Sequence, residues 1–138
     1  MGTINMIAVW TNGCFDVIHR GHIEMMQYAK SLGNKLYVGI DSDAKVKNDK
    51  GTSRPFNNER DRKFILESLE CVDEVIIFDS PDDLTRNIKN VSPKYLVVGG
   101  DWRNKPVVGS DYAEEVKFFD RIPGYSTTAI LEKNENLC

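Results

Sequence analysis

The chain has 138 residues and a formal net charge of −3, with 41% hydrophobic and 28% charged residues. The acidic balance argues against a nucleic-acid partner, because such proteins bind phosphates through surplus positive charge. No apolar run approaches the roughly 20 residues of a membrane span, and no signal peptide opens the sequence. We therefore expect a cytoplasmic protein with no membrane partner, built as a single domain over residues 1–138, with a core over about 6–130 and a frayed tail over 131–138.

The first predicted strand, Met6–Trp10, leads into the stretch Thr11-Asn-Gly-Cys-Phe-Asp-Val-Ile-His-Arg-Gly-His22, and a helical pattern covers Gly21–Leu32. At such a junction the helix start presents unpaired backbone N–H groups and the positive end of its dipole, which favours bound phosphate. Gly13 and Gly21 allow phosphate oxygens to approach the main chain closely. The junction therefore predicts a nucleotide phosphate site.

His19 and His22 are three residues apart in this stretch, about one helical turn, so both imidazoles can face the same ligand. An imidazole donates one or two N–H groups to phosphate oxygens, depending on its protonation. Two other interpretations stay open. One is zinc ligation, although structural zinc sites usually need four ligands, and the other is a purely structural pair. Cys14 lies beside the histidines, and we expect it to be a small packed residue rather than a nucleophile.

Leu36–Ile40 is predicted to be the second strand, and Asp41 and Asp43 follow at its carboxyl end. In doubly wound sheets, ligands bind outside the carboxyl ends of the strands, so both carboxylates are expected at the functional edge. Residues 44–57 are polar and basic without clear periodicity. This pattern predicts a long loop, and long loops in compact domains are usually functional or disordered.

The segment from Lys45 to Lys63 carries seven basic residues against three acidic ones, although the chain as a whole is acidic. A local group of cations focuses positive potential at one mouth of the protein, which suits a small anionic substrate. Within this group we assign function to Lys47, Lys50 and Arg54. Lys45, taken alone, is interpreted as a solvated surface charge.

A helix is predicted to start at Asn57-Asn58, with a core face formed by Phe64, Ile65, Leu66 and Leu69. Val72–Phe78 follows as a third strand, apolar on both faces in its second half, as buried parallel strands are. Ser80–Asp83 then forms a capping box with proline at the first helical position, which predicts a helix to about Lys89.

The fourth predicted strand, Tyr95–Val98, runs directly into Gly99-Gly-Asp-Trp-Arg103. The two glycines allow the backbone to approach a planar base, and Asp101 can accept hydrogen bonds from a base, a ribose or an acceptor. Glu115–Phe119 is the fifth predicted strand. The alternation of strands and helices predicts an α/β fold, namely a Rossmann-like doubly wound five-stranded parallel sheet with helices on both faces.

Near the end of the chain, Arg121-Ile-Pro-Gly-Tyr-Ser-Thr-Thr128 predicts a second phosphate site. Ser126 is expected to cap the last helix, which places the backbone N–H groups of Thr127 and Thr128 against phosphate oxygens. The alternative is that Ser-Thr-Thr is only a good helix cap. The neighbouring Gly124-Tyr125 and the nearby arginine favour binding.

The stretch from Thr11 to His22 resembles the signature of the cytidylyltransferase-like nucleotidyltransferase superfamily, whose His-x-Gly-His motif binds the phosphates of a nucleoside triphosphate. Three motifs are similar to those of the heptose 1-phosphate adenylyltransferases, namely Lys50-Gly-x-x-Arg54-Pro55, Val107-Val-Gly-Ser110 and Gly124-Tyr-Ser-Thr-Thr128. In those enzymes the Val-Gly of the second motif leads into a short helix. By contrast, Gly-Asp-Trp102 and the spacing of Arg121 resemble the glycerol-3-phosphate cytidylyltransferases. Val98 also stands where the heptose enzymes usually have lysine.

The resemblance implies transfer of a nucleotidyl group from a nucleoside triphosphate to a phosphorylated acceptor, with release of pyrophosphate and with Mg²⁺ as cofactor. The implied catalytic residues are His19, His22, Lys47 and Lys50. The implied nucleotide-binding residues are Thr11, Asn12, Gly13, Cys14, Phe15, Asp16, Gly21, Gly99, Gly100, Asp101, Arg121, Gly124, Tyr125, Ser126, Thr127 and Thr128. The implied acceptor-binding residues are Asp41, Asp43, Arg54, Arg60 and Trp102. Asp16 either touches the metal or fixes the turn.

ATP and a heptose or other sugar 1-phosphate are the expected substrates, giving an ADP-sugar. One alternative is CTP with glycerol 3-phosphate, giving CDP-glycerol. Another is a nucleotide-binding module without catalytic activity, since fold alone does not establish function. The resemblance also implies a homodimer and a separate sugar kinase upstream, because this chain has no room for a kinase domain.

Overall fold

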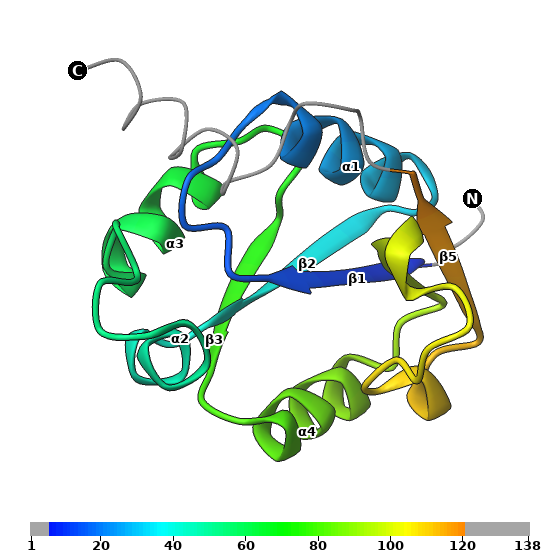
Figure 1. Cartoon of the computed structure of the whole chain (residues 1–138). Coiled ribbons are helices and arrows are strands. Elements are labelled where there is room, and N and C mark those ends of the chain that lie inside the picture. The colour runs from blue at the N-terminus through cyan, green and yellow to red at the C-terminus, as the bar shows by residue number, and fades with distance from the viewer. Residues whose placement is uncertain (1–5, 121–138) are drawn as a thin grey trace.

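The computed structural model describes residues 6–120, whose central element is a five-stranded sheet (Figure 1). All of its strand pairs are parallel, in the order β3-β2-β1-β4-β5. The strands are β1 Ala8–Gly13, β2 Lys35–Asp41, β3 Glu74–Phe78, β4 Tyr95–Gly99 and β5 Glu115–Phe119. The predicted five-stranded parallel sheet is therefore confirmed. The predictions for Arg121, Gly124, Tyr125, Ser126, Thr127, Thr128 and the tail lie outside the described residues.

Helices on both sides of the sheet connect the strands. They are α1 Arg20–Ser31, α2 Asp43–Lys50, α3 Glu59–Glu67, α4 Pro81–Val91 and the two short 3₁₀ helices η1 Gly100–Trp102 and η2 Ser110–Tyr112. Figure 1 shows α1 and α4 on opposite sides of the sheet, as a doubly wound fold requires. From β1 the chain runs outward to β2 and β3, then returns to form β4 and β5 on the other side. The strand order therefore reverses between β1 and β4, where such folds bind ligands.

Strand β1 contributes to two separate hydrophobic cores, because successive side chains of a strand point to opposite faces. Val9 belongs to the core shared with α1 and α3, which includes Met26 and Leu66. Trp10 belongs to the core beneath α4, which includes Leu84 and Ile88. Strand β1 is thus packed on both faces, and its carboxyl end leads into the loop to α1.

The structure corrects the prediction that residues 44–57 form a loop, because Asp43–Lys50 is helix α2. Ser42 caps this helix by accepting a hydrogen bond from the backbone N–H of Lys45 at 3.2 Å. Val46 is its only buried residue, so the sequence contains no apolar period that would mark a helix. The basic residues of this segment are consequently presented on a rigid element.

The core face of α3 agrees with the prediction only in part, since Leu66 is buried and Leu69 packs against the core as predicted, whereas Phe64 and Ile65 do not. Phe64 is 73% exposed and Ile65 is 38% exposed, whereas Arg62 and Leu66 are fully buried. These two buried residues are one helical turn apart and share one face of the helix. An arginine at a core position interrupts the apolar pattern, and for that reason the sequence pattern included the exposed Phe64 and Ile65 and left out Arg62.

Several boundaries lie close to those predicted. Strand β1 continues three residues further than expected, so Thr11–Gly13 belongs to the sheet and the β1–α1 loop is reduced to residues 14–19. Strand β5 has the predicted bounds, and η2 follows Gly109 as the resemblance implied. In residues 6–120 no helix is both long and apolar enough to cross a lipid bilayer.

Candidate active site

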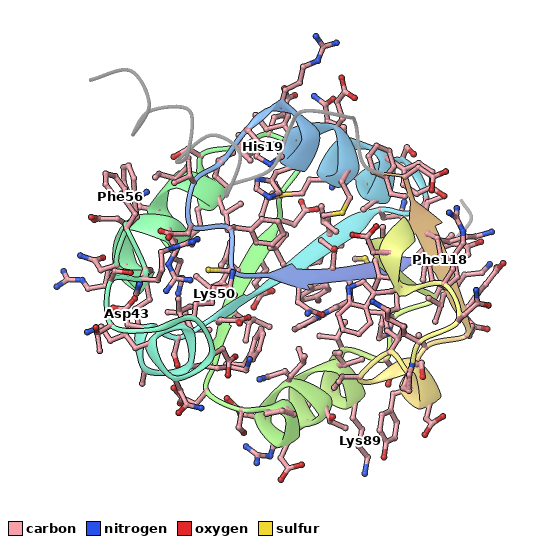
Figure 2. The ribbon with its side chains drawn as sticks, in the orientation of Figure 1. His19, Asp43, Lys50, Phe56, Lys89 and Phe118 are labelled. Carbon is pink, nitrogen blue, oxygen red and sulfur yellow. The ribbon has the colours of Figure 1, made fainter. Side chains whose placement is uncertain are left out.

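The histidine pair lies at the start of α1, where Figure 2 shows His19. The rings of His19 and His22 are stacked, with centroids 3.8 Å apart and planes inclined by 21°. Phe15 supports His22 with an edge-on contact, with ring centroids 5.2 Å apart. The structure therefore brings the two imidazoles together, as their spacing predicts.

A backbone contact orients the second imidazole. The backbone N–H of His19 donates a hydrogen bond to Nδ1 of His22, with the two nitrogens 3.3 Å apart. A nitrogen that accepts a hydrogen bond carries no proton, so in the neutral ring the proton is on Nε2. His22 is thus held in a tautomer whose remaining nitrogen is a hydrogen-bond donor.

Asp16 fixes the β1–α1 loop from within, because its carboxylate is 1% exposed and fully engaged. Its Oδ1 accepts a hydrogen bond from the backbone N–H of Asn57, and its Oδ2 accepts from the backbone N–H of Phe56, each at 2.7 Å. Nε of Arg54 donates to the same Oδ2 at 2.8 Å. Of the two roles considered for Asp16, these contacts support fixing the turn rather than binding a metal.

We expect Asp16→Asn to lower the free energy of unfolding at pH 7 by about 1–3 kcal/mol, the usual loss when a buried hydrogen-bonded group is unmatched. Burial alone raises the pKa of Asp16, but the bonds from Asn57, Phe56 and Arg54 outweigh it and lower the pKa. A lowered folded-state pKa gives stability that is present above the unfolded value, about 3.9, and is lost at lower pH. Urea unfolding at pH 7 and pH 3 should therefore show the difference shrinking, and an unchanged difference would refute this assignment.

Arg62 joins four segments around the site from a fully buried position on α3. Its Nη1 donates to the backbone carbonyls of Cys14 at 2.9 Å and Asp41 at 2.7 Å. Nε donates to the carbonyl of Asn57 at 3.0 Å, and Nη2 pairs with the carboxylate of Asp43 at 2.8 Å. One guanidinium therefore holds the ends of β1 and β2, the start of α2 and the segment before α3 in fixed relation.

These contacts revise three acceptor-binding predictions. Arg60 is exposed, and Arg62, two residues later, is the arginine that extends from this helix into the site region. Arg54 pairs with the buried Asp16, and Asp43 pairs with Arg62. In the structure, Arg54 and Asp43 therefore stabilise the loops around the site through their side chains.

A cleft of about 310 Å³ opens at the carboxyl ends of β1, β2 and β4, beside the switch point. Its lining residues are Asn12, Gly13, Cys14, Asp41, Lys45, Lys50, Phe78, Pro81, Leu84, Val98, Trp102, Val107 and Val108. The cleft lies on the α4 side of the sheet, since Phe78 and Leu84 belong to the core beneath α4. The histidines pack with Phe15 on the α1 side, so the cleft and the histidine pair flank the β1–α1 loop.

The basic residues of α2 divide between the cleft and solvent. Lys50 lines the cleft, at the end of β1 in Figure 2, whereas Lys47 is exposed and does not line it. Lys45, interpreted from the sequence as a solvated charge, lines the cleft with a side chain that is only 18% exposed. Burial alone lowers the pKa of Lys45, but its bonds to Asp49 and Asp41 raise the pKa, so Lys45 is a cation at neutral pH.

The segment after β4 forms the wall opposite α2. Gly99 and Gly100 lead into η1, and Trp102 lines the cleft while remaining 46% exposed. A Cβ at position 100 would lie 2.4 Å from Oδ1 of Asp120, which is the end of an exposed side chain and can shift. The structure therefore places Trp102 where a ligand in the cleft can contact an indole face.

Three residues predicted to bind nucleotide have structural side chains. Thr11 is fully buried, and its hydroxyl donates to the backbone carbonyl of Val97 at 2.9 Å, which joins β1 to β4. Phe15 is 4% exposed within the core. Cys14 lines the cleft, but burial raises the pKa of its thiol, which supports the packing role over that of a nucleophile. Of these three, only Cys14 lines the cleft.

Sequence reasoning missed several residues that form this region. Phe78, Pro81 and Leu84 were expected only as strand, cap and helix, yet they form the apolar wall of the cleft. Arg62 could have been found from its spacing, because it lies four residues after the capping Asn58 and four before Leu66. That spacing placed Arg62 on the inner face of α3.

Comparison with known proteins identifies relatives across most of the chain. The Bifunctional protein HldE of a Nitratiruptor species is 54% identical over 127 residues, which are 91% of this chain and 27% of that protein. The Bifunctional protein HldE of Helicobacter pylori (strain Shi470) is 46% identical over 130 residues, which are 94% of this chain and 28% of that protein. The chain therefore spans little more than a quarter of the length of these relatives.

Solved structures share the fold at lower identity. A lipopolysaccharide core biosynthesis protein from Thermoplasma volcanium GSS1 gives a TM-score of 0.66 at 24% identity, over 86% of this chain and 98% of its own. A bifunctional NMN adenylyltransferase/ADP ribose pyrophosphatase from Francisella tularensis gives 0.59 at 18% identity, over 96% of this chain and 42% of its own. A family model described as Cytidylyltransferase-like matches residues 10–133. Because this match covers nearly the whole sequence, the chain belongs to the cytidylyltransferase-like family of nucleotidyltransferases.

Proposed function

We propose that this chain transfers the adenylyl group of ATP to a sugar 1-phosphate, with heptose 1-phosphate as the first candidate, and releases pyrophosphate. The observation that carries the proposal is the placement of a cleft lined by Lys45 and Lys50 and a stacked histidine pair on the two sides of one short loop. The HldE relatives and the motifs similar to heptose 1-phosphate adenylyltransferases support the choice of substrates.

The reaction needs no general base from the protein. The second pKa of a phosphate monoester is near 6, so the acceptor phosphate is already an anion at pH 7. Its oxygen attacks the α-phosphorus of ATP, the bond from that phosphorus to the bridging oxygen breaks, and pyrophosphate leaves with the electron pair. Catalysis then consists of aligning the two phosphates and neutralising the charge on the leaving group.

The residues around the β1–α1 loop suit those two tasks. The imidazoles of His19 and His22 supply donors to the α- and β-phosphates, and the start of α1 adds the positive end of its dipole. Lys50 supplies a cation from the cleft side. The cleft volume of about 310 Å³ is at the small end of the range for ligand pockets. This size favours binding of one sugar phosphate in the cleft rather than of both substrates.

The described side chains do not form a binding cage for Mg²⁺. Among residues 6–120 no group of three or more His, Cys, Asp or Glu side chains is placed to hold a metal ion. The carboxylate of Asp16 is already engaged by three hydrogen bonds. We therefore propose that Mg²⁺ enters as the complex with the triphosphate, whose charge it partly neutralises.

A substrate matrix tests the proposed function. Pyrophosphate release is measured from ATP, CTP, GTP and UTP, each paired with heptose 1-phosphate, other sugar 1-phosphates and glycerol 3-phosphate. ATP with a sugar 1-phosphate should give the highest kcat/KM. A strong preference for CTP with glycerol 3-phosphate would replace the adenylyl assignment, and no release from any pair would favour a non-catalytic nucleotide-binding module.

The remaining expectations from the resemblance stay predictions. They are a homodimer, a separate sugar kinase that supplies the acceptor, and a cytoplasmic location. Light scattering after size-exclusion chromatography would test the first, since symmetric dimers are the common oligomers.

Lys50→Ala is expected to lower kcat/KM by about tenfold or more, because a cation that contacts phosphate is lost from the cleft. Lys47→Ala should have a smaller effect, since Lys47 does not line the cleft. Lys89→Ala, on exposed α4 surface, controls for the general loss of a lysine. Steady-state rates are measured for the three variants, and thermal unfolding checks that all three are as stable as the wild-type chain. Equal losses of kcat/KM in all three variants would contradict the assignment.

A further inference from the structure

Asp41 and Lys45 form an ion pair on the cleft wall. Nζ of Lys45 lies 3.3 Å from Oδ2 of Asp41 and 2.7 Å from Oδ2 of Asp49. The side chains of Asp41 and Lys45 are 15% and 18% exposed, whereas that of Asp49 is 43% exposed. The first two line the cleft, and Asp49 supports the lysine from outside it.

The charges of this group do not suit a phosphate. Two carboxylates flank the single ammonium of Lys45, so the group carries a net negative charge that repels a phosphate. Lys50 also lines the cleft, and it forms no ion pair with another residue among 6–120. An acceptor phosphate is therefore favoured near Lys50, close to Gly13 and Cys14, and disfavoured beside Asp41.

The wall around the pair suits a sugar ring instead. Phe78, Pro81, Leu84 and Val98 provide apolar surface for the C–H groups of a ring. A carboxylate accepts hydrogen bonds from hydroxyl groups, and an ammonium donates to their oxygens. The main chain of Asp41 is held by Arg62 through its carbonyl, so its carboxylate is presented from a fixed position.

We infer that Asp41 and Lys45 determine acceptor specificity by binding hydroxyl groups of the sugar, while Lys50 takes the phosphate. The inference rests on the proposed function and adds the orientation of the acceptor in the cleft. A substrate that lacks the matching hydroxyl loses a charge-assisted hydrogen bond to this pair, so the site discriminates against that analogue. Glycerol 3-phosphate, which has no ring to fill the apolar wall, should be a poor acceptor for the same reason.

The test compares Asp41→Asn and Lys45→Met with the wild-type chain, using heptose 1-phosphate and its monodeoxy analogues as acceptors. Each variant should raise the KM for heptose 1-phosphate about tenfold or more and change the KM for ATP less than about threefold. For the wild-type chain, one deoxy analogue should have a higher KM than heptose 1-phosphate. For Asp41→Asn, the KM values of that analogue and of heptose 1-phosphate should be equal. The matched controls are Asp61→Asn and Lys89→Met, which are on exposed surface outside the cleft.

The outcomes separate the two proposals. No pyrophosphate release by the wild-type chain with any pair overturns the proposed function and this inference with it. Wild-type turnover with an unchanged acceptor KM in both variants overturns only the inference. Thermal unfolding of each variant shows whether it is folded, and because the carbonyl that Arg62 binds is retained in Asp41→Asn, we expect that variant to fold.

Discussion

His22→Ala is expected to lower turnover by about 10²–10³-fold while the protein remains folded, the usual loss when one donor to a transition-state oxygen is removed. The donor in question is Nε2, since Nδ1 of His22 accepts the backbone N–H of His19. The ring is half-buried and contacts His19 and Phe15, so its removal also leaves a small space at the start of α1. Steady-state rates and circular dichroism measure the two effects separately.

His19→Ala should show a loss of similar size, because its ring is stacked on that of His22. His22→Gln is a useful companion, since an amide can donate a hydrogen bond but carries no charge. A partial recovery of turnover in His22→Gln would identify hydrogen-bond donation as the main contribution. Unchanged turnover in both alanine variants would remove the histidine pair from the reaction.

Arg62→Met is expected to lower the free energy of unfolding by about 3–5 kcal/mol, because one partner of a buried ion pair is removed. The loss leaves the carboxylate of Asp43 and the carbonyls of Cys14, Asp41 and Asn57 without this donor. The side chain of Asp43 is 29% exposed, so water recovers part of the loss and the lower end of the range is expected. Urea unfolding at pH 7 is the measurement.

Arg86→Met is the matched control for Arg62→Met. Arg86 is 67% exposed and pairs with Asp83 on the surface of α4, so its replacement should cost at most about 1 kcal/mol. Asp43→Asn tests the pair from the other side and keeps a hydrogen-bond acceptor for the guanidinium. If Arg62→Met and Arg86→Met lowered the free energy of unfolding equally, the buried contacts of Arg62 would not stabilise the fold as proposed.

The sequence predicted elements wherever local pattern and tertiary structure agree. Strand β5 has the predicted bounds, and Ser80 caps α4 as its spacing with Asp83 indicated. Helix α2 was missed because a helix with one buried residue has no apolar period, and only its Ser42 cap marks it. Secondary structure stabilised mainly by capping and ion pairs is therefore the least visible in a sequence.

The sequence predicted the motifs of the candidate site, but not which residues of distant segments come together to form the cleft. The His-x-Gly-His spacing placed two imidazoles together because a helical turn is a local geometry. The cleft, by contrast, combines residues from positions 12 to 108, and its apolar wall consists of residues that pattern alone assigns to the core. Lys45 was interpreted as a solvated charge because the cleft that it lines is completed by other segments, and no role was assigned to Arg62, whose partners Cys14 and Asp41 are distant in sequence.

The position of the β1–α1 loop between the cleft and the histidines has a consequence for stereochemistry. In the proposed reaction, the acceptor phosphate in the cleft would approach the α-phosphorus from one side of this loop, and pyrophosphate would leave on the side of the histidines. That arrangement requires the entering and leaving oxygens to be in line during a single displacement. An ATP made chiral at the α-phosphorus should therefore give an ADP-sugar of inverted configuration, and retention would indicate a covalent nucleotidyl-enzyme intermediate.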